Sequence, residues 1–292
     1  MSRTNRIELR GQMPRVATAL PNFRLVGHGR TDVGLRREVN EDSYLILPKN
    51  SIWIVADGMG GHAGGQVASR LTVEKTGSAL LKLLGRAEDA LRKDRRAIDL
   101  EAIMTEAIQE TCHAVFDEAL DRPTLAGMGS TVTTALVYGS RAWIGHVGDS
   151  RAYLIRNGKI SQQTKDHSLV QEQVDAGLIN AEQAKHSMIR NIITRSIGFE
   201  RDVKVDAFSF PIERGDHLLL CTDGLTGHVE DDEILDIVLN NPRRIVPTKL
   251  IELANARGGE DNSTVILTTV VSRRGRQRDK RRRPGPDGRA ST

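Results

Sequence analysis

Aspartates placed directly after apolar runs are the residues of this sequence best suited to chemistry. Asp57 follows the apolar run 52–55 and leads into Gly58, Gly60 and Gly61. The run is typical of a buried strand, and the glycines let the backbone come close to a small ligand. A carboxylate beside bare backbone carbonyls suits a hard divalent cation, because such cations take oxygen ligands.

The same pattern recurs along the chain. Asp223 follows the run 218–222, Asp149 follows the run 143–147, and Asp261 precedes a further β-type run. A single Asp-Gly pair usually marks a turn, so Asp149 could simply cap one, and Asp261 could be a solvated loop acid. Taken together, the acids predict one metal centre gathered from separate strands. The scarcity of Cys and His ligands favours Mg²⁺ or Mn²⁺ over Zn²⁺.

A neighbouring arginine suggests that the ligand is a phosphate. Carboxylates this close repel each other unless cations neutralise them. Two such cations could bridge a water, lower its pKa and hold it for in-line attack on phosphorus. A bidentate arginine would grip the phosphate oxygens. Of Arg36 and Arg37 we choose Arg37, which lies five residues before Asp42.

Size and composition point to a globular protein. Of the 292 residues, 38% are hydrophobic and 27% charged, which is enough for a well-buried core. No apolar run approaches the ~20 residues of a spanning helix, so we expect no membrane insertion. There is no secretory signal pattern, and the two cysteines, Cys112 and Cys221, fit a reducing compartment. We therefore expect a cytoplasmic protein.

The charge is unevenly distributed. Beyond residue 272 the chain has nine Lys and Arg residues and two acids, so the rest of the chain carries a net charge of −3 within a total of +4. We expect residues 273–292 to be a disordered, Arg-rich tail. Such a tail could contact nucleic acid or another anionic surface, or could only add solubility. It has no aromatic residues for base stacking.

Strand and helix patterns come in blocks. Residues 1–22 are expected to form a flexible extension, and the highly charged residues 85–98 a surface loop. Strand patterns cover residues 23–26, 43–47, 52–57, 131–138, 142–147, 151–155, 203–210, 217–222 and 263–271. Helical patterns cover residues 66–84, 100–120, 230–239 and 246–256, and a polar, mostly helical excursion covers 165–196. Consecutive hairpins and paired helices predict an α+β fold with antiparallel sheets and helices packed outside.

Eight motifs, in order, resemble one enzyme family. They are REVNED (37–42), ADGMGGH (56–62), GST (129–131), GDSR (148–151), KDHS (165–168), ITRSIG (193–198), CTDGL (221–225) and EDNST (260–264). Over about residues 23–271 the chain resembles the bacterial branch of the metal-dependent, type 2C serine/threonine protein phosphatases. The resemblance implies a catalytic domain over 23–272 and a four-layer sandwich, in which two antiparallel sheets are flanked by helix pairs. It also implies a flap at about 166–189.

The resemblance further implies roles for individual residues. Two Mn²⁺ or Mg²⁺ ions, with a possible third, would sit at one edge of the sheets. The implied ligands of the two ions are Asp57, which would bridge them, the carbonyl of Gly58, Asp223 and Asp261. Asp149 would serve the third ion. Glu41 and Asp42 would act in the outer shell. Arg37 would bind the substrate phosphate. His62 would protonate the leaving oxygen, or else act as a hydrogen-bond donor farther out.

The implied reaction is hydrolysis of phosphoserine and phosphothreonine in proteins by a metal-bridged hydroxide that attacks phosphorus directly. No phosphoenzyme is expected, because no Cys or His nucleophile stands in a suitable motif. We expect a monomer whose partners are phosphorylated proteins, a serine/threonine kinase and that kinase's substrates. Two alternatives stay open: a non-catalytic module that senses phosphoproteins or metal, and a binder of nucleic acid or anionic surfaces through the tail.

Overall fold

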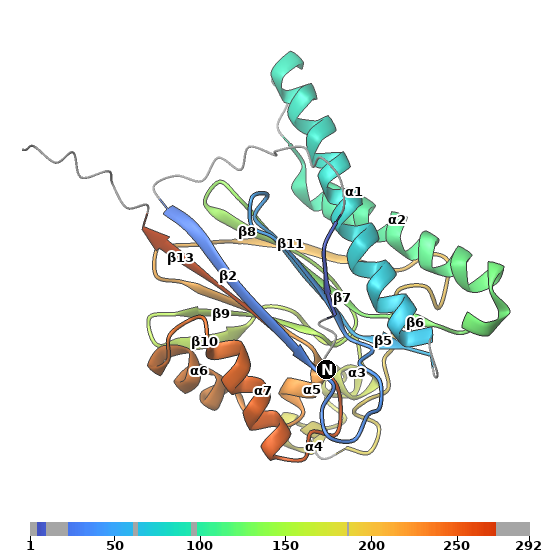
Figure 1. Ribbon diagram of the computed structural model, residues 1–292, viewed down its shortest axis with the longest axis vertical. Helices are drawn as coiled ribbons and strands as arrows, with labels where there is room; N and C mark the ends of the chain where they lie inside the picture. Colours follow the sequence, from blue (N-terminus) through green and yellow to red (C-terminus); the bar gives the residue numbers. More distant parts are fainter. Residues whose placement is uncertain (1–4, 10–22, 61–63, 95–97, 186, 273–292) are drawn as a thin grey trace, which may run out of the picture.

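Two β-sheets packed face to face form the centre of the molecule (Figure 1). The computed structural model describes residues 5–9, 23–60, 64–94, 98–185 and 187–272. The first sheet has the strand order β1 (Arg6–Ile7), β3 (Ser43–Leu47), β4 (Ile52–Ala56), β7 (Val132–Tyr138), β8 (Arg141–Val147) and β11 (Asp206–Pro211). The second has the order β10 (Lys159–Gln162), β9 (Arg151–Arg156), β12 (His217–Cys221), β13 (Ser263–Ser272) and β2 (Phe23–Asp32).

Helices cover the outer faces of both sheets. α1 (Gly64–Asp94) and α2 (Leu100–Asp121) lie on the first sheet, and α6 (Asp231–Asn240) and α7 (Val246–Ala256) lie on the second (Figure 1). Short elements complete the fold: β5 (Gly58–Met59), β6 (Gly129–Ser130), η1 (Pro123–Leu125), α3 (Leu169–Asp175), α4 (Ala181–Lys185) and α5 (Asp223–Thr226). The predicted α+β fold, with two sheets flanked by helix pairs, is confirmed.

Strand alternation explains why the central strands are apolar throughout. Side chains along a strand point to opposite faces. In β4, Ile52 and Ile54 therefore face the helices, while Trp53 and Val55 face the other sheet. Both faces are buried, so a continuous apolar run replaces the alternation of a half-exposed strand.

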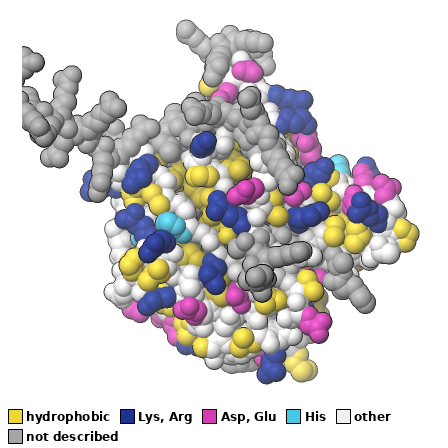
Figure 2. Space-filling view, viewed as in Figure 1, with side chains coloured by type: hydrophobic (Ala, Val, Ile, Leu, Met, Phe, Trp, Pro, Cys, Tyr) yellow, Lys and Arg dark blue, Asp and Glu magenta, His cyan; other side chains and the backbone are white. Residues whose placement is uncertain are grey.

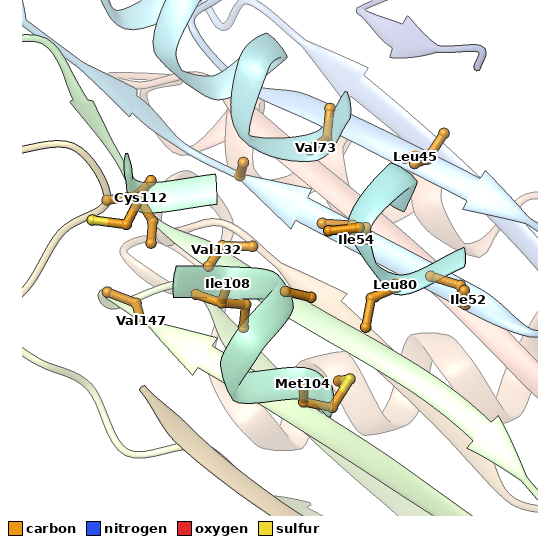
Figure 3. Close-up of a cluster of buried hydrophobic side chains, with 14 of the residues drawn as sticks. Leu45, Ile52, Ile54, Val73, Leu80, Met104, Ile108, Cys112, Val132 and Val147 are labelled. Carbon is orange, nitrogen blue, oxygen red and sulfur yellow. The ribbon is translucent and has the colours of Figure 1, made fainter. Parts of the chain in front are cut away.

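The largest core lies between the first sheet and its helices. Leu45, Ile52 and Ile54 of the strands meet Leu80 of α1 and Met104 of α2 (Figure 3). Burying one such side chain stabilises the fold by roughly 1.5–3 kcal/mol. A second core fills the space between the sheets, and a third lies under α6 and α7. The sheets are thus fixed on both faces, and their edge loops are held in place.

Three predictions about the elements were wrong. Residues 85–94, predicted as part of a loop, continue α1. Within the expected flexible extension 1–22, Arg6–Ile7 form β1, which pairs with β3 in parallel, so the first sheet is not wholly antiparallel. Among the described residues of the excursion 165–196, only α3 and α4 are helical. The tail 273–292 and residues 1–4 and 10–22 lie outside the described residues. Over the described part of the chain, no helix has both the length and the apolar character needed to span a bilayer.

Candidate metal centre

Strand direction brings acids of the first sheet to one edge. β4 and β8 each run antiparallel to β7, so they run parallel to each other and end on the same side. Asp57 follows the first of these strands and Asp149 the second. β3 runs antiparallel to β4 with Ser43 opposite Ala56, which places Asp42 beside Asp57.

The second sheet contributes the other two aspartates. β12 and β13 are antiparallel, so Asp223 after β12 and Asp261 before β13 lie at the same end of the sheet. The two sheets meet at Asp42: the hydroxyls of Thr222 and Thr264 hydrogen bond to its Oδ2 at 2.8 and 2.7 Å. The structure therefore gathers all five predicted aspartates at one edge.

These carboxyl groups oppose each other's ionisation. Burial, followed by the charges of Asp42, Asp223 and Asp149, raises the pKa of Asp57 well above its ordinary value. Burial and the charge of Asp223 also raise the pKa of Asp149. Burial and the charge of Asp261 raise the pKa of Asp223. Burial raises the pKa of Asp42 to about 7, against the hydrogen bonds that it accepts. A cation placed among these groups would favour their charged forms.

The donor set fits hard divalent cations. Asp42 Oδ1, Asp149 Oδ1 and Asp223 Oδ1 are buried oxygens without a hydrogen-bond partner among the described residues. Buried oxygens of this kind normally have a partner, and a cation can be that partner. Because the potential ligand atoms are oxygens, these residues suit Mn²⁺ or Mg²⁺. Asp42 and Asp149 of the cluster are buried. On the face shown in Figure 2, the exposed Asp and Glu side chains are dispersed among Lys and Arg.

The carboxylates are not arranged as a ready-made coordination shell. Among the described residues, no three His, Cys, Asp or Glu side chains are placed together as ligands of one ion. Instead, Arg37 Nη2 lies 2.8 Å from Asp261 Oδ2. Cation binding at Asp261 therefore competes with an arginine.

Arg37 is the arginine that reaches the cluster. Its side chain is half exposed, at the rim. Burial opposes its charge, but Asp261, Glu41 and Asp57 together raise its pKa. Arg36 is exposed and makes no ion pair with a described residue. Of the two neighbouring arginines, the structure thus places Arg37 beside the acids.

Gly58 and Glu41 line the same edge. A side chain at Gly58 would overlap the carbonyl of Gly65 and crowd that of Glu41, so only glycine fits there. Burial raises the pKa of Glu41, Arg37 opposes this, and Asp261 adds to it. His62 lies outside the described residues.

Comparisons with known proteins identify the family of this chain. A family model described as protein phosphatase 2C matches residues 35–250. The chain belongs to the protein phosphatase 2C family. The serine/threonine phosphatase stp of Listeria welshimeri is 39% identical over 244 residues, which cover 82% of this chain and 93% of that protein. The predicted family and enzyme class are thereby confirmed.

Solved structures of family members have the same fold. The crystal structure of Mycobacterium tuberculosis PstP/Ppp aligns with a TM-score of 0.74 at 36% identity, covering 85% of this chain and 99% of that one. The catalytic domain of PstP in complex with two manganese ions aligns with a TM-score of 0.70 at 36% identity, covering 86% and 100%. Two Mn²⁺ ions are thus present in a relative of this phosphatase.

Sequence reasoning missed the residues that hold the loops of the phosphatase in place. Asn262 is buried; its Oδ1 accepts from Glu41 N at 2.7 Å, and its Nδ2 donates to the carbonyls of Val33 and Val39 at 2.9 and 3.1 Å. Asp57 N donates to Thr131 Oγ1 at 2.9 Å. Asn262 lies in the EDNST motif and Thr131 in the GST motif. Their position within these motifs is the sequence feature that could have pointed to their role.

We expect Asn262→Ala to loosen the loop that carries Arg37 and Glu41. The substitution leaves one backbone amide and two carbonyls without their partner, which costs about 3 kcal/mol of unfolding free energy. Urea denaturation at pH 7.5 measures it. Asn240→Ala, which removes an exposed side-chain hydrogen bond to Asp236, is the control and should change stability by less than about 0.5 kcal/mol. Equal stabilities for the two variants would contradict this role.

The metal-free phosphatase should lose stability as pH rises. The raised pKa of Asp42 means that the folded state keeps a proton that the unfolded state has released. Stability from this group is complete below pH 3.8 and is lost as pH rises through about 7, a fall of about 2 kcal/mol between pH 5.5 and 7.5. Buried His146, whose pKa is lowered to about 4, has the opposite slope below pH 6.5. The test is therefore the difference between wild type and Asp42→Asn in EDTA.

The difference between wild type and Asp42→Asn in the pH dependence of stability should become smaller when Mn²⁺ is added. A bound cation then replaces the proton in offsetting the charges of the carboxylates. If the unfolding free energies of wild type and Asp42→Asn in EDTA changed with pH in the same way, the pKa of Asp42 would not be raised in the folded state.

Proposed function

We propose that this phosphatase hydrolyses phosphoserine and phosphothreonine in proteins, with water attacking phosphorus directly and no phosphoenzyme. The observation that supports it most is the cluster of mutually repelling carboxylates at one sheet edge, with Arg37 at its rim. The named activity of the relatives supports the substrate class.

Each acid has a part in this proposal. Asp57 and the Gly58 carbonyl would hold one divalent ion, and Asp57, Asp223 and Asp261 would hold the other, with Mn²⁺ and Mg²⁺ as the candidate ions. Asp149 with Asp223 would serve a third, weaker ion, and Glu41 and Asp42 would act from the outer shell. When bound, the ions supply Lewis-acid stabilisation of charge and activate water.

The remaining residues act on the substrate. The Arg37 guanidinium leaves Asp261 to hold the phosphate oxygens by two parallel hydrogen bonds, which orients phosphorus toward the acids. His62 donates a proton to the leaving serine or threonine oxygen. The catalytic domain extends over residues 23–272 together with β1, which completes the first sheet, and a flap at about 166–189 lies beside the site.

The biological setting is part of the same proposal. The protein acts as a monomer in the cytoplasm, where it opposes a serine/threonine kinase and acts on that kinase's substrates. Cys112 and Cys221 are both free and buried, which suits a reducing compartment.

Hydrolysis of p-nitrophenyl phosphate and of phosphopeptides by the purified protein tests the proposal. The assays contain EDTA, Mg²⁺, Mn²⁺ or Zn²⁺. We expect phosphate release that depends on Mn²⁺ or Mg²⁺ and stops in EDTA. A folded protein that turns over neither substrate with any of these ions would instead favour a module that senses phosphoproteins.

A further inference from the structure

His167 is a buried residue that the proposed chemistry does not use. It lies at the start of the flap, with 4% of its side chain exposed. Its backbone N–H donates to the carbonyl of Gly148 at 2.7 Å, and its ring Nδ1 accepts from the Gly148 N–H at 3.1 Å. Both polar groups of Gly148 are thus held by one residue, and Gly148 directly precedes Asp149.

The second ring nitrogen is hydrogen bonded to a carboxylate. Because Nδ1 accepts a hydrogen bond it carries no proton, so the proton of the neutral ring is on Nε2. Nε2 lies 3.2 Å from Asp206 Oδ2, to which it donates. Arg195 Nη1 donates to the other oxygen, Oδ1, at 3.0 Å, and it also lies 3.1 Å from His167 Nε2. Because Nε2 carries the proton it cannot accept from Arg195, so both N–H groups are directed at Asp206. Burial lowers the pKa of His167, which supports the neutral form.

Asp206 is anchored in the first sheet. It begins β11, where it pairs with His146 of β8. A continuous set of hydrogen bonds therefore runs from a sheet strand through Asp206 and His167 to Gly148. Histidines that serve metal sites are commonly oriented by such carboxylate partners, but His167 acts here on a backbone turn.

Thr131 packs against the Gly148 turn on the side opposite His167. Gly148 has a φ of +110°, and a Cβ there would overlap the side chain of Thr131. Thr131 Oγ1 in turn lies 2.8 Å from Ser150 Oγ and accepts from Asp57 N. The turn before Asp149 is thus held between Thr131 and His167.

His167 also closes the neck of the flap. Its carbonyl accepts from Thr194 N at 2.8 Å, and the neighbouring Leu169 N donates to Ile192 O at 2.8 Å. The start of the flap, the segment 192–194 just after it and the Asp149 turn therefore meet at this one residue.

We propose that His167 and Asp206 are positioning residues: their hydrogen-bonded pair holds the Gly148–Asp149 turn against the neck of the flap and so sets how well Asp149 serves a cation. The inference rests on the proposed function, which gives Asp149 to the third, weaker ion. Neither residue touches substrate.

Two substitutions separate the bonds of His167. In His167→Asn the side-chain oxygen can still accept from Gly148 N, but the side chain no longer reaches Asp206. Asp206→Ala removes the carboxylate and leaves the ring in place. Both lose the bond between His167 and Asp206, and Asp206→Ala also loses the bond from Arg195. The double variant should therefore be no worse than Asp206→Ala alone. His167→Ala loses both bonds and should be the most affected.

The readouts are the Mn²⁺ concentration for half-maximal hydrolysis, Mn²⁺ binding by calorimetry, and amide hydrogen exchange at Gly148. For His167→Ala we expect the Mn²⁺ requirement of the weakest site to rise about tenfold, the lower end for loss of an outer partner. We expect Gly148 exchange to accelerate at least about tenfold in His167→Ala and to stay slow in His167→Asn. Asp117→Ala, which breaks the exposed Arg201–Asp117 pair of 2.6 Å, is the matched control and should change none of these.

An unchanged Mn²⁺ requirement and unchanged Gly148 exchange in folded His167→Ala would overturn the proposal, as would additive effects of His167→Asn and Asp206→Ala. Absence of turnover in the wild type would instead count against the proposed function. Hydrogen exchange at Gly148 and calorimetric Mn²⁺ binding do not need turnover. They therefore test the role of His167 and Asp206 whether or not the protein is active as a phosphatase.

Discussion

Asp223→Asn should abolish Mn²⁺-dependent phosphate release and yet raise the melting temperature of the metal-free protein. Asp223 adds to the charge that raises the pKa values of Asp57 and Asp149, and one of its own oxygens is buried without a partner. Neutralising it relieves this repulsion, by about 1–2 kcal/mol. The same change removes an oxygen of a proposed metal ligand. Losing the charge stabilisation that a bound ion gives should lower turnover by at least about 10³-fold.

Differential scanning fluorimetry in EDTA and p-nitrophenyl phosphate hydrolysis with Mn²⁺ measure the two effects. Asp216→Asn is the matched control: Asp216 is a buried aspartate that is paired with Arg156 at 2.7 Å, away from the acids. This control should lower the melting temperature and leave turnover per folded molecule unchanged. Full activity in Asp223→Asn would remove Asp223 from the site.

Arg37→Ala should lower kcat/KM for phosphopeptides by about 100-fold. A bidentate arginine contact with a phosphate is a strong, charge-assisted interaction, and losing about 2.7 kcal/mol corresponds to this factor. The Mn²⁺ requirement should not rise, because the substitution frees Asp261 from a competing positive charge. Arg37→Lys should restore only part of the activity, since an ammonium group cannot make two parallel hydrogen bonds.

Arg36→Ala is the control for this prediction. It removes the same charge one residue away, from an exposed side chain without an ion pair to any described residue. Steady-state kinetics on one phosphopeptide should separate the two variants clearly. Equal losses in both would mean that the loop attracts phosphate by general charge only.

The acids of the site were predictable because their signal is local. Asp57 and Asp223 directly follow runs that are buried on both faces, and a buried run ending in Asp-Gly is visible in the sequence itself. The partners of these acids were not predictable in the same way. Arg37 and Asp261 are 224 positions apart, and only the pairing of the strands brings them within 2.8 Å.

The errors in the fold also have physical reasons. Residues 85–94 are charged, which suggested a loop, but Arg, Ala, Glu and Leu are good helix formers and simply extend α1. β1 has two residues, too few for any periodic pattern, and exists through its pairing with β3. The conformation of the segment around α3 and α4 depends on contacts such as those of His167, which no local pattern encodes.

β1 has a consequence for how the protein is produced. It covers the outer edge of β3, whose sequence SYLIL is uncharged and largely apolar. Asn5 adds hydrogen bonds from its side chain to the carbonyls of Asn40 and Asp42 at 2.7 and 2.9 Å. A variant shortened to begin at residue 23 would leave this edge unpaired, and an unpaired apolar edge strand is a template for self-association. Light scattering should therefore show aggregation of the shortened protein at concentrations where the full chain stays dispersed.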